Sequence, residues 1–271
     1  MSTAKVILIT GASSGNGKAT AELLSQRGNQ VFGTSRNPAA SNEPSTFKLL
    51  PLDVRSDNSV AECVNSVLEQ AGRIDVLVNN AGYELGGALE EISLDEARAQ
   101  FETNFFGVMR MTKAVLSGMR QRKDGQIINI GSLSGIAPVP FLGIYSASKF
   151  ALEGYSEALF HEVQPFNIRV SIIEAGFLKT PLMEKRQMAA QMISDYDTWR
   201  QRAMKSVREY EETGPDAHLV ADTVLQIIES KSPQLRYIIG QQAKSIFRFR
   251  RFLPESMFNP GSRRTFKLDG K

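Results

Sequence analysis

The chain has 271 residues, the length of one large α/β domain. Its 42% hydrophobic and 23% charged residues are typical of a globular protein, and a net charge of +3 argues against a nucleic-acid-binding protein. A single cysteine, Cys63, excludes an internal disulfide and fits a reducing compartment. No apolar run approaches the roughly 20 residues of a membrane span, and the N-terminal run is too short for a secretory signal. We therefore expect a cytoplasmic protein with no integral membrane segment.

Short runs rich in β-branched residues alternate along the chain with stretches long enough for helices. Most of these runs are continuously apolar, as strands covered on both faces are. Right-handed strand–helix–strand units repeated in this way predict an α/β fold, a doubly wound Rossmann-type parallel sheet of about seven strands with helices on both faces. We expect one domain over residues 1–240, followed by a tail over 241–271. The expected strands are residues 5–10, 30–35, 46–53, 74–80, 125–132, 168–175 and 236–240.

A glycine-rich turn follows the first expected strand, in the stretch "VILITGASSGNGK". Glycines between the first strand and the first helix let the backbone approach a pyrophosphate, and the N-terminus of the helix offers free N–H groups and positive potential. The alternative is a glycine-rich turn that holds no ligand. We predict cofactor contacts from Gly11, Ser13, Ser14, Gly15, Asn16 and Gly17.

The spacing of these glycines is Gly-x-x-x-Gly-x-Gly, which differs from the commoner dinucleotide-binding pattern. Together with "NNAG" at 79–82, Ser132 and the Tyr145-x-x-x-Lys149 pair, it resembles the classical short-chain dehydrogenase/reductase family, in its hydroxysteroid and retinol dehydrogenase-like branch. The resemblance covers roughly residues 4–240. It implies a Rossmann-type fold, a nicotinamide cofactor, hydride transfer between an alcohol and a carbonyl, and assembly into a homodimer or homotetramer.

Tyr145 and Lys149 stand four residues apart on an expected helix, so they share one face of it. A phenol has a pKa near ~10, and a neighbouring ammonium lowers the pKa and favours the phenolate. Tyr145 is thereby suited to be a general acid for carbonyl reduction and a base for alcohol oxidation. Ser132 ends a strand at the edge where ligands bind, and its hydroxyl can fix the substrate oxygen. The resemblance implies that Lys149 also holds the nicotinamide ribose and that Asn104 holds a water against Lys149. The alternative is that Tyr145 and Lys149 are a chance pair on a helix surface with no catalytic role.

The end of the second expected strand predicts the choice of cofactor. It reads "VFGTSRN", with Ser35 where NAD-binding proteins carry an acid and with Arg36 next to it. A guanidinium suits the 2′-phosphate of NADP, so we expect NADP, with NAD less favoured. Ala175 stands where the family usually has proline, which puts the geometry of the loop after it in question. The resemblance implies further cofactor contacts from Asp53, Val54, Asn80, Ala81, Gly82, Gly176, Phe177 and Thr180, besides Tyr145 and Lys149.

Residues 181–214 are methionine-rich and have the spacing of one or two amphipathic helices. In this fold such an insert lies over the nicotinamide as a lid, and an adaptable apolar surface suits a lipophilic substrate such as a steroid or retinoid. Simple packing of the insert on the core is the alternative. The tail mixes arginine with phenylalanine, and we expect its phenylalanines to pack on the body or on a second subunit. A membrane surface or an acidic partner is the alternative.

The sequence thus predicts an NADP(H)-dependent oxidoreductase that interconverts a small-molecule alcohol and its carbonyl. Two alternatives stay open: a reductase of 3-oxoacyl thioesters, which shares the catalytic motifs, and a non-catalytic regulator that senses NADP and keeps only the fold. The two histidines, His161 and His218, lack metal-ligand spacing, so we expect no metal.

Overall fold

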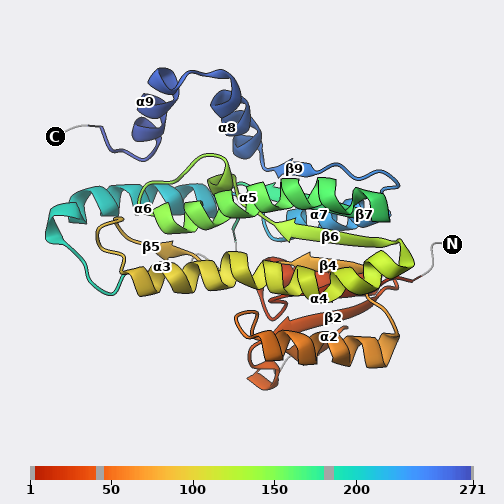
Figure 1. The fold of residues 1–271 in the computed structure, drawn as a ribbon. Coiled ribbons are helices and arrows are strands. Elements are labelled where there is room, and N and C mark those ends of the chain that lie inside the picture. The colour runs from red at the N-terminus through yellow and green to blue at the C-terminus, as the bar shows by residue number, and fades with distance from the viewer. Residues whose placement is uncertain (1–3, 41–45, 180–185, 270–271) are drawn as a thin grey trace.

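The computed structural model describes residues 4–40, 46–179 and 186–269 of the chain. Its centre is a seven-stranded, wholly parallel sheet with the strand order β3-β2-β1-β4-β6-β7-β9 (Figure 1). This order reverses between β1 and β4, as in doubly wound folds, so the predicted fold class and its seven strands are confirmed. The strands are β1 Val6–Ile9, β2 Gln30–Ser35, β3 Lys48–Pro51, β4 Val76–Asn79, β6 Gly125–Ile130, β7 Ile168–Ala175 and β9 Arg236–Ile239.

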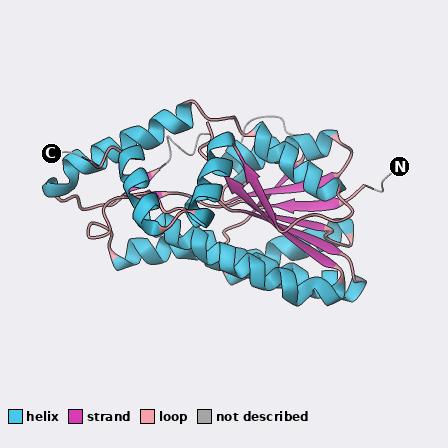
Figure 2. Ribbon diagram, turned by 90° about the horizontal axis from the view of Figure 1, so that it is seen from above, coloured by secondary structure: helices cyan, strands magenta, loops and turns pink. Residues whose placement is uncertain are grey.

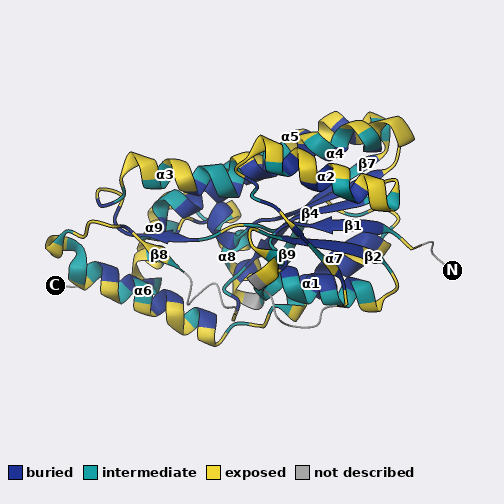
Figure 3. Ribbon diagram, turned by 90° about the horizontal axis from the view of Figure 1, so that it is seen from below, coloured by how far each residue is buried: buried dark blue, intermediate teal, exposed yellow. Residues whose placement is uncertain are grey.

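Helices cover both faces of the sheet (Figure 2). One face packs against α1 Gly15–Gln26 and α7 His218–Glu229, and the other against α2 Asp57–Ala71, α4 Gly107–Arg122 and α5 Gly143–Val163. The strands are buried between these two layers, while the outer faces of the helices are exposed (Figure 3). That burial explains the continuously apolar strands of the sequence.

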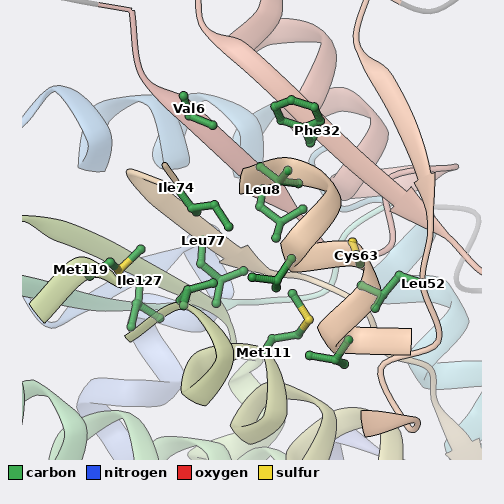
Figure 4. Packing of buried hydrophobic residues seen from close by; sticks show 14 of the residues in the cluster. Val6, Leu8, Phe32, Leu52, Cys63, Ile74, Leu77, Met111, Met119 and Ile127 are labelled. Carbon is green, nitrogen blue, oxygen red and sulfur yellow. The ribbon is translucent and has the colours of Figure 1, made fainter. Parts of the chain in front are cut away.

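The core on the α2, α4 and α5 side joins strands and helices through large apolar side chains (Figure 4). Leu8, Leu77 and Ile127 come from three neighbouring strands, and Met111 of α4 lies over them; all four are fully buried. Cys63 of α2 lies in the same core, and burial raises the pKa of its thiol to about 11. The cysteine is therefore a packing residue at neutral pH.

Smaller elements extend the carboxyl edge of the sheet, where the site lies. The short strands β5 Leu85–Gly86 and β8 Gln187–Met188 pair in parallel, and the helix α6 Asp197–Glu212 falls within the predicted insert of residues 181–214. Thr180 and residues 181–185 lie outside the described part of the chain. The remaining elements are α3 Leu94–Phe101, a π-helical turn at Glu102–Phe106, and 3₁₀ turns at Pro38–Ala40, Leu133–Gly135, Gln164–Phe166 and Ser194–Tyr196.

The tail folds into two helices, α8 Gln241–Phe252 and α9 Glu255–Thr265, which lie together beyond β9 (Figure 1). Phe266 is buried in an apolar cluster with Val139 and Leu142, so the expected packing of the tail on the body is observed there. Phe252, in contrast, is 77% exposed. Within the part of the chain that the structure describes, no helix is long and apolar enough to cross a membrane.

Candidate active site

A cavity of about 540 Å³ opens at the carboxyl ends of the sheet strands. It is lined by the turns that follow β1, β2, β3, β4, β6 and β7, together with the first turns of α5. Of the site residues predicted from the sequence, Gly17 does not line this cavity, and Thr180 lies outside the described residues. The predicted residues that do line it are Gly11, Ser13, Ser14, Gly15, Asn16, Arg36, Asp53, Val54, Asn80, Ala81, Gly82, Asn104, Ser132, Tyr145, Lys149, Gly176 and Phe177.

The glycine-rich turn after β1 adopts a conformation that demands its glycines. Gly11 and Gly15 have φ angles of +68° and +56°, in the left-handed region that L side chains rarely adopt. The Asn80 side chain braces the turn, because its Nδ2 donates hydrogen bonds of 2.9 Å to the carbonyl oxygens of Thr10 and Gly11. The fourth strand of the chain thereby holds the turn that follows the first.

Gly17 has a packing role rather than a place in the cavity lining. A Cβ built on it would lie 2.3 Å from the Gly11 carbonyl oxygen and 2.5 Å from Asn80 Nδ2. Only glycine therefore lets α1 begin this close to the turn. The first turn of α1 carries no acidic residue, so its positive dipole end faces the cavity without a countering charge of its own. A tight turn and an uncompensated helix N-terminus fit the pyrophosphate of a dinucleotide.

The end of the cavity at β2 and β3 is lined by two arginines. Arg36 is exposed at its edge, and Arg55, which sequence reasoning missed, lies opposite Asp53. Arg55 Nη2 lies 2.6 Å from Asp53 Oδ2 and Arg55 Nε lies 2.9 Å from Asp53 Oδ1. These hydrogen bonds lower the pKa of Asp53. Among the described residues that line this end, Asp53 is the carboxylate, and it is already paired, which leaves this end suitable for an anionic group.

The predicted catalytic residues lie at the other end of the cavity. Tyr145 and Lys149 on α5 are 6% and 8% exposed, and Lys149 Nζ lies 5.8 Å from the centre of the Tyr145 ring. Lys149 Nζ also donates a 2.8 Å hydrogen bond to the carbonyl oxygen of Ile130, at the end of β6. Burial lowers the pKa of Lys149 to about 8, so its ammonium is still charged at neutral pH. The predicted pairing of a phenol and an ammonium on one helix face is present.

The expectation that Lys149 lowers the pKa of Tyr145 is wrong for the protein alone. Burial dominates and raises the pKa of the phenol, and the charge of Glu84 raises it further, while the Ser132 hydroxyl that hydrogen-bonds the phenol acts in the opposite direction. Desolvation disfavours the phenolate more than the nearby positive charge favours it. Tyr145 therefore carries its proton, the form in which it can act as an acid.

Asn104 lies in the π-helical turn at Glu102–Phe106, a distortion that is frequent at functional sites. It is 1% exposed. Its Oδ1 accepts from the Tyr83 N–H at 3.1 Å, and its Nδ2 donates to the Tyr83 carbonyl at 3.0 Å and to Ser148 Oγ at 3.3 Å. The amide therefore ties the loop after β4 to α5, which carries Tyr145.

A buried carboxyl pair beneath the site was missed by sequence reasoning. Glu174 of β7 is fully buried, and a Cβ on Gly131 would lie 2.4 Å from Glu174 Oε1, so the carboxyl lies directly under the residue before Ser132. Among the residues that the structure describes, no donor meets either Glu174 oxygen in hydrogen-bond geometry, although the Ser132 N–H lies near enough to favour the charged form. Burial and then Glu153 raise the pKa of Glu174 well above its ordinary value. Burial therefore favours the protonated, uncharged form of Glu174.

A second buried ionic group, the Glu84–Arg186–Glu211 cluster, lies at the wall of the cavity. Glu84 follows β4, Arg186 precedes β8 and Glu211 lies in the last turn of α6. Arg186 Nη2 is 2.6 Å from Glu84 Oε2 and 2.5 Å from Glu211 Oε1, and the three side chains are 8–10% exposed. Glu84 and Glu211 line the same cavity as Tyr145. The charges of Glu84 and Arg186 act on the pKa of that phenol, so the cluster lies close to the reacting centre.

A doubly wound sheet with a glycine-rich turn after β1, and with a serine and a buried tyrosine and lysine at the carboxyl ends of its strands, defines a dinucleotide-binding α/β protein. Residues 5–191 match the family described as short chain dehydrogenase. The chain belongs to this family and is an oxidoreductase of it, which confirms the resemblance drawn from the motifs.

Relatives of known name match nearly the whole chain. A 3-ketodihydrosphingosine reductase of Bacteroides thetaiotaomicron is 41% identical over 93% of this chain and 94% of its own length. Human retinol dehydrogenase 8 is 37% identical over 86% of this chain and 80% of its own length.

Two solved structures share the fold. A short-chain dehydrogenase from Streptomyces avermitilis, 32% identical, has a TM-score of 0.82 and covers 99% of this chain and 100% of its own. An actinorhodin polyketide ketoreductase with NADPH, 30% identical, has a TM-score of 0.74 and covers 87% of this chain and 95% of its own.

Proposed function

We propose that the chain is an NADP(H)-dependent oxidoreductase that interconverts a lipophilic alcohol and its carbonyl by hydride transfer. The observation that carries this proposal is that buried Tyr145 and Lys149 line one end of the cavity together with half-buried Ser132, while the glycine-rich turn lines the other end. A bound nicotinamide supplies the hydride for reduction or accepts it in oxidation. All other steps fall to side chains of the chain itself.

In the reducing direction, Tyr145 donates its proton to the substrate oxygen as the carbonyl carbon becomes an alcohol carbon. The neutral state of the buried phenol supports this role. Ser132 hydrogen-bonds the same oxygen and fixes it against the phenol. The charged Lys149 stabilises the phenolate left behind, and Asn104 holds a water through which the proton is replaced. In the oxidising direction the same groups act in reverse.

Arg36 and Arg55 support NADP over NAD. Both line the end of the cavity at β2 and β3, where Arg55 neutralises Asp53 and so leaves the charge of Arg36 for the 2′-phosphate. Arg36→Ala should weaken NADPH binding at least tenfold more than NADH binding, as a charge-assisted contact of roughly 1.5–3 kcal/mol implies. Arg27→Ala, at the exposed end of α1 and outside the cavity, is the matched control. Equal losses for both cofactors would contradict the preference.

The relatives support a lipid substrate, since two of them are named for a sphingoid ketone and for retinol. We assign residues 1–240 to the catalytic domain, 181–214 to its substrate lid and 241–271 to an appended tail, and we expect a cytoplasmic homodimer or homotetramer. A 3-oxoacyl thioester reductase and a non-catalytic NADP sensor stay as alternatives.

NADPH consumption against a panel of carbonyls tests the proposal. The panel holds steroid ketones, retinal, 3-ketodihydrosphingosine, aromatic aldehydes and a 3-oxoacyl thioester, with Tyr145→Phe beside the wild type. We expect turnover of a lipophilic class and a loss of at least ~100-fold in Tyr145→Phe, which removes only the proton donor. Turnover of the thioester alone favours the first alternative. NADPH binding without turnover of any carbonyl favours the sensor, and unchanged turnover in Tyr145→Phe refutes the mechanism.

A further inference from the structure

We propose that the Glu84–Arg186–Glu211 cluster binds an ammonium group of the substrate, so that the physiological substrate is a long-chain amino ketone or the corresponding amino alcohol. This inference rests on the proposed oxidoreductase function and names its substrate class.

The cluster holds more carboxyl groups than guanidinium groups. Two carboxyl groups share one guanidinium: Arg186 Nε donates to Glu84 Oε2 at 2.7 Å, and Arg186 Nη2 donates to Glu211 Oε1 at 2.5 Å. Glu211 Oε2 is buried and accepts no hydrogen bond from any residue that the structure describes. Burial raises the pKa of Glu211 to about 7, so its carboxyl is partly protonated at neutral pH, while the charges of Arg186 and of the exposed Arg208 favour the carboxylate. A buried carboxylate oxygen with no donor is costly, and a cationic ligand group removes that cost.

The position of the cluster suits a group close to the reacting carbonyl. Glu84 and Glu211 line the cavity together with Tyr145 and Ser132. The Glu84 charge also acts directly on the pKa of Tyr145. An ammonium held here therefore lies near the carbonyl carbon, as it does when the amine and the carbonyl occupy neighbouring carbons. A neutral steroid or retinoid offers no such cation and leaves Glu211 Oε2 without a partner.

The carboxylates are held in place by the surrounding backbone. The Leu85 N–H donates a 2.9 Å hydrogen bond to Gln100 Oε1, and the Gln187 N–H donates a 3.0 Å hydrogen bond to the Glu84 carbonyl. The loop that carries Glu84 is therefore fixed on both sides, and α6 fixes Glu211. A site whose charged groups are held before the ligand arrives loses little entropy on binding.

The two ion pairs of Arg186 could also have a purely structural role, here called the latch, in which they hold β8 and α6 against the loop after β4. The two roles differ in one respect. A latch affects every substrate alike, whereas an ammonium site distinguishes an amine from its uncharged derivative.

The test compares 3-ketodihydrosphingosine with its N-acetyl derivative, which has the same carbonyl and chain but no charge, in wild type and Glu211→Gln. We expect wild type to prefer the free amine, and we expect Glu211→Gln to lose ~10- to 100-fold more kcat/KM on the amine than on the amide, mostly through KM. Glu209→Gln, an exposed partner of Lys267 on the same helix, should leave both values unchanged. Equal losses on amine and amide, or no wild-type preference, would overturn the proposal in favour of the latch.

A binding measurement separates this inference from the proposed function. Calorimetric titration of the NADP-loaded protein with the amino alcohol sphinganine should show binding that Glu211→Gln weakens at least tenfold. If no carbonyl is turned over but this selective binding persists, the proposed function fails and the ammonium site stands. If carbonyls are turned over and sphinganine binding is the same in the variant, the ammonium site fails alone. Glu84→Gln repeats the comparison should Glu211→Gln melt at a lower temperature than wild type.

Discussion

Gly17→Ala tests whether the start of α1 must lie directly against the turn after β1. The added Cβ would meet the Gly11 carbonyl oxygen at 2.3 Å and Asn80 Nδ2 at 2.5 Å, both well inside van der Waals contact. Overpacking of this kind costs about 1–3 kcal/mol. It also displaces the amide that makes two 2.9 Å hydrogen bonds, each contributing about 1 kcal/mol. The higher helix propensity of alanine relative to glycine offsets about 1 kcal/mol of this loss. We expect a net loss of about 2–4 kcal/mol.

Urea unfolding followed by circular dichroism, together with NADPH titration, measures both consequences. Gly154→Ala is the matched control, because Gly154 is also helical, is exposed on α5 and would place its Cβ in open space. The same substitution should stabilise the protein there by up to about 1 kcal/mol. We also expect Gly17→Ala to weaken NADPH binding, because the turn that holds the pyrophosphate moves. Should Gly17→Ala be as stable as Gly154→Ala, the close approach of α1 would not be a constraint.

Three further predictions concern buried groups. Between about pH 8 and pH 10.5, the unfolding free energy of wild type should rise relative to that of Lys149→Met by up to about 3 kcal/mol, because over this range the unfolded chain binds a proton that the buried lysine has lost. Parallel urea titrations of both proteins across this range measure the difference, and an equal dependence of unfolding free energy on pH in the two proteins would contradict it. Because the pKa of Glu174 is raised, wild type should lose stability relative to Glu174→Gln as pH rises above 4.5. Thermal melting of both proteins from pH 5 to pH 8 measures this, and melting temperatures that change in parallel would mean that the carboxyl is charged. Phe266→Ala should weaken the packing of the tail on the body by about 3–5 kcal/mol and make α9 accessible to trypsin. Phe252→Ala, at a 77% exposed side chain, should change neither, and equal digestion rates for the two variants would contradict the anchoring role of Phe266.

Features set by local spacing could be predicted from the sequence. Seven apolar runs gave the seven strands of the sheet, because burial on both faces removes polar residues from a parallel strand. The four-residue spacing of Tyr145 and Lys149 placed them on one face of α5, and the glycines after β1 located the turn. Each of these features depends on residues within one element or at its end. Ser132 and Asn104 needed the family resemblance in addition, because they reach the site from other elements.

Features set by long-range contacts were missed. Arg186 meets Glu84 across 102 residues and Glu211 across 25, and no local pattern joins the three. Glutamate and arginine are usually exposed, so nothing in the sequence indicates that these are buried. Arg55 was missed for a related reason: its position beside Arg36 depends on the register of β2 and β3, which only the assembled sheet fixes.

The error over the pKa of Tyr145 bears on the direction of catalysis. Sequence reasoning considered nearby positive charge and left out desolvation, which is the larger effect on each group because both are buried. A neutral phenol is the form needed for reduction, and reduced nicotinamide, which carries no positive charge on its ring, leaves the phenol neutral. An oxidised nicotinamide bound in the cavity would add positive charge and would favour the phenolate that accepts a proton in oxidation. On the proposed mechanism, the redox state of the cofactor would therefore favour one protonation state of Tyr145, and Lys149 would stabilise the phenolate.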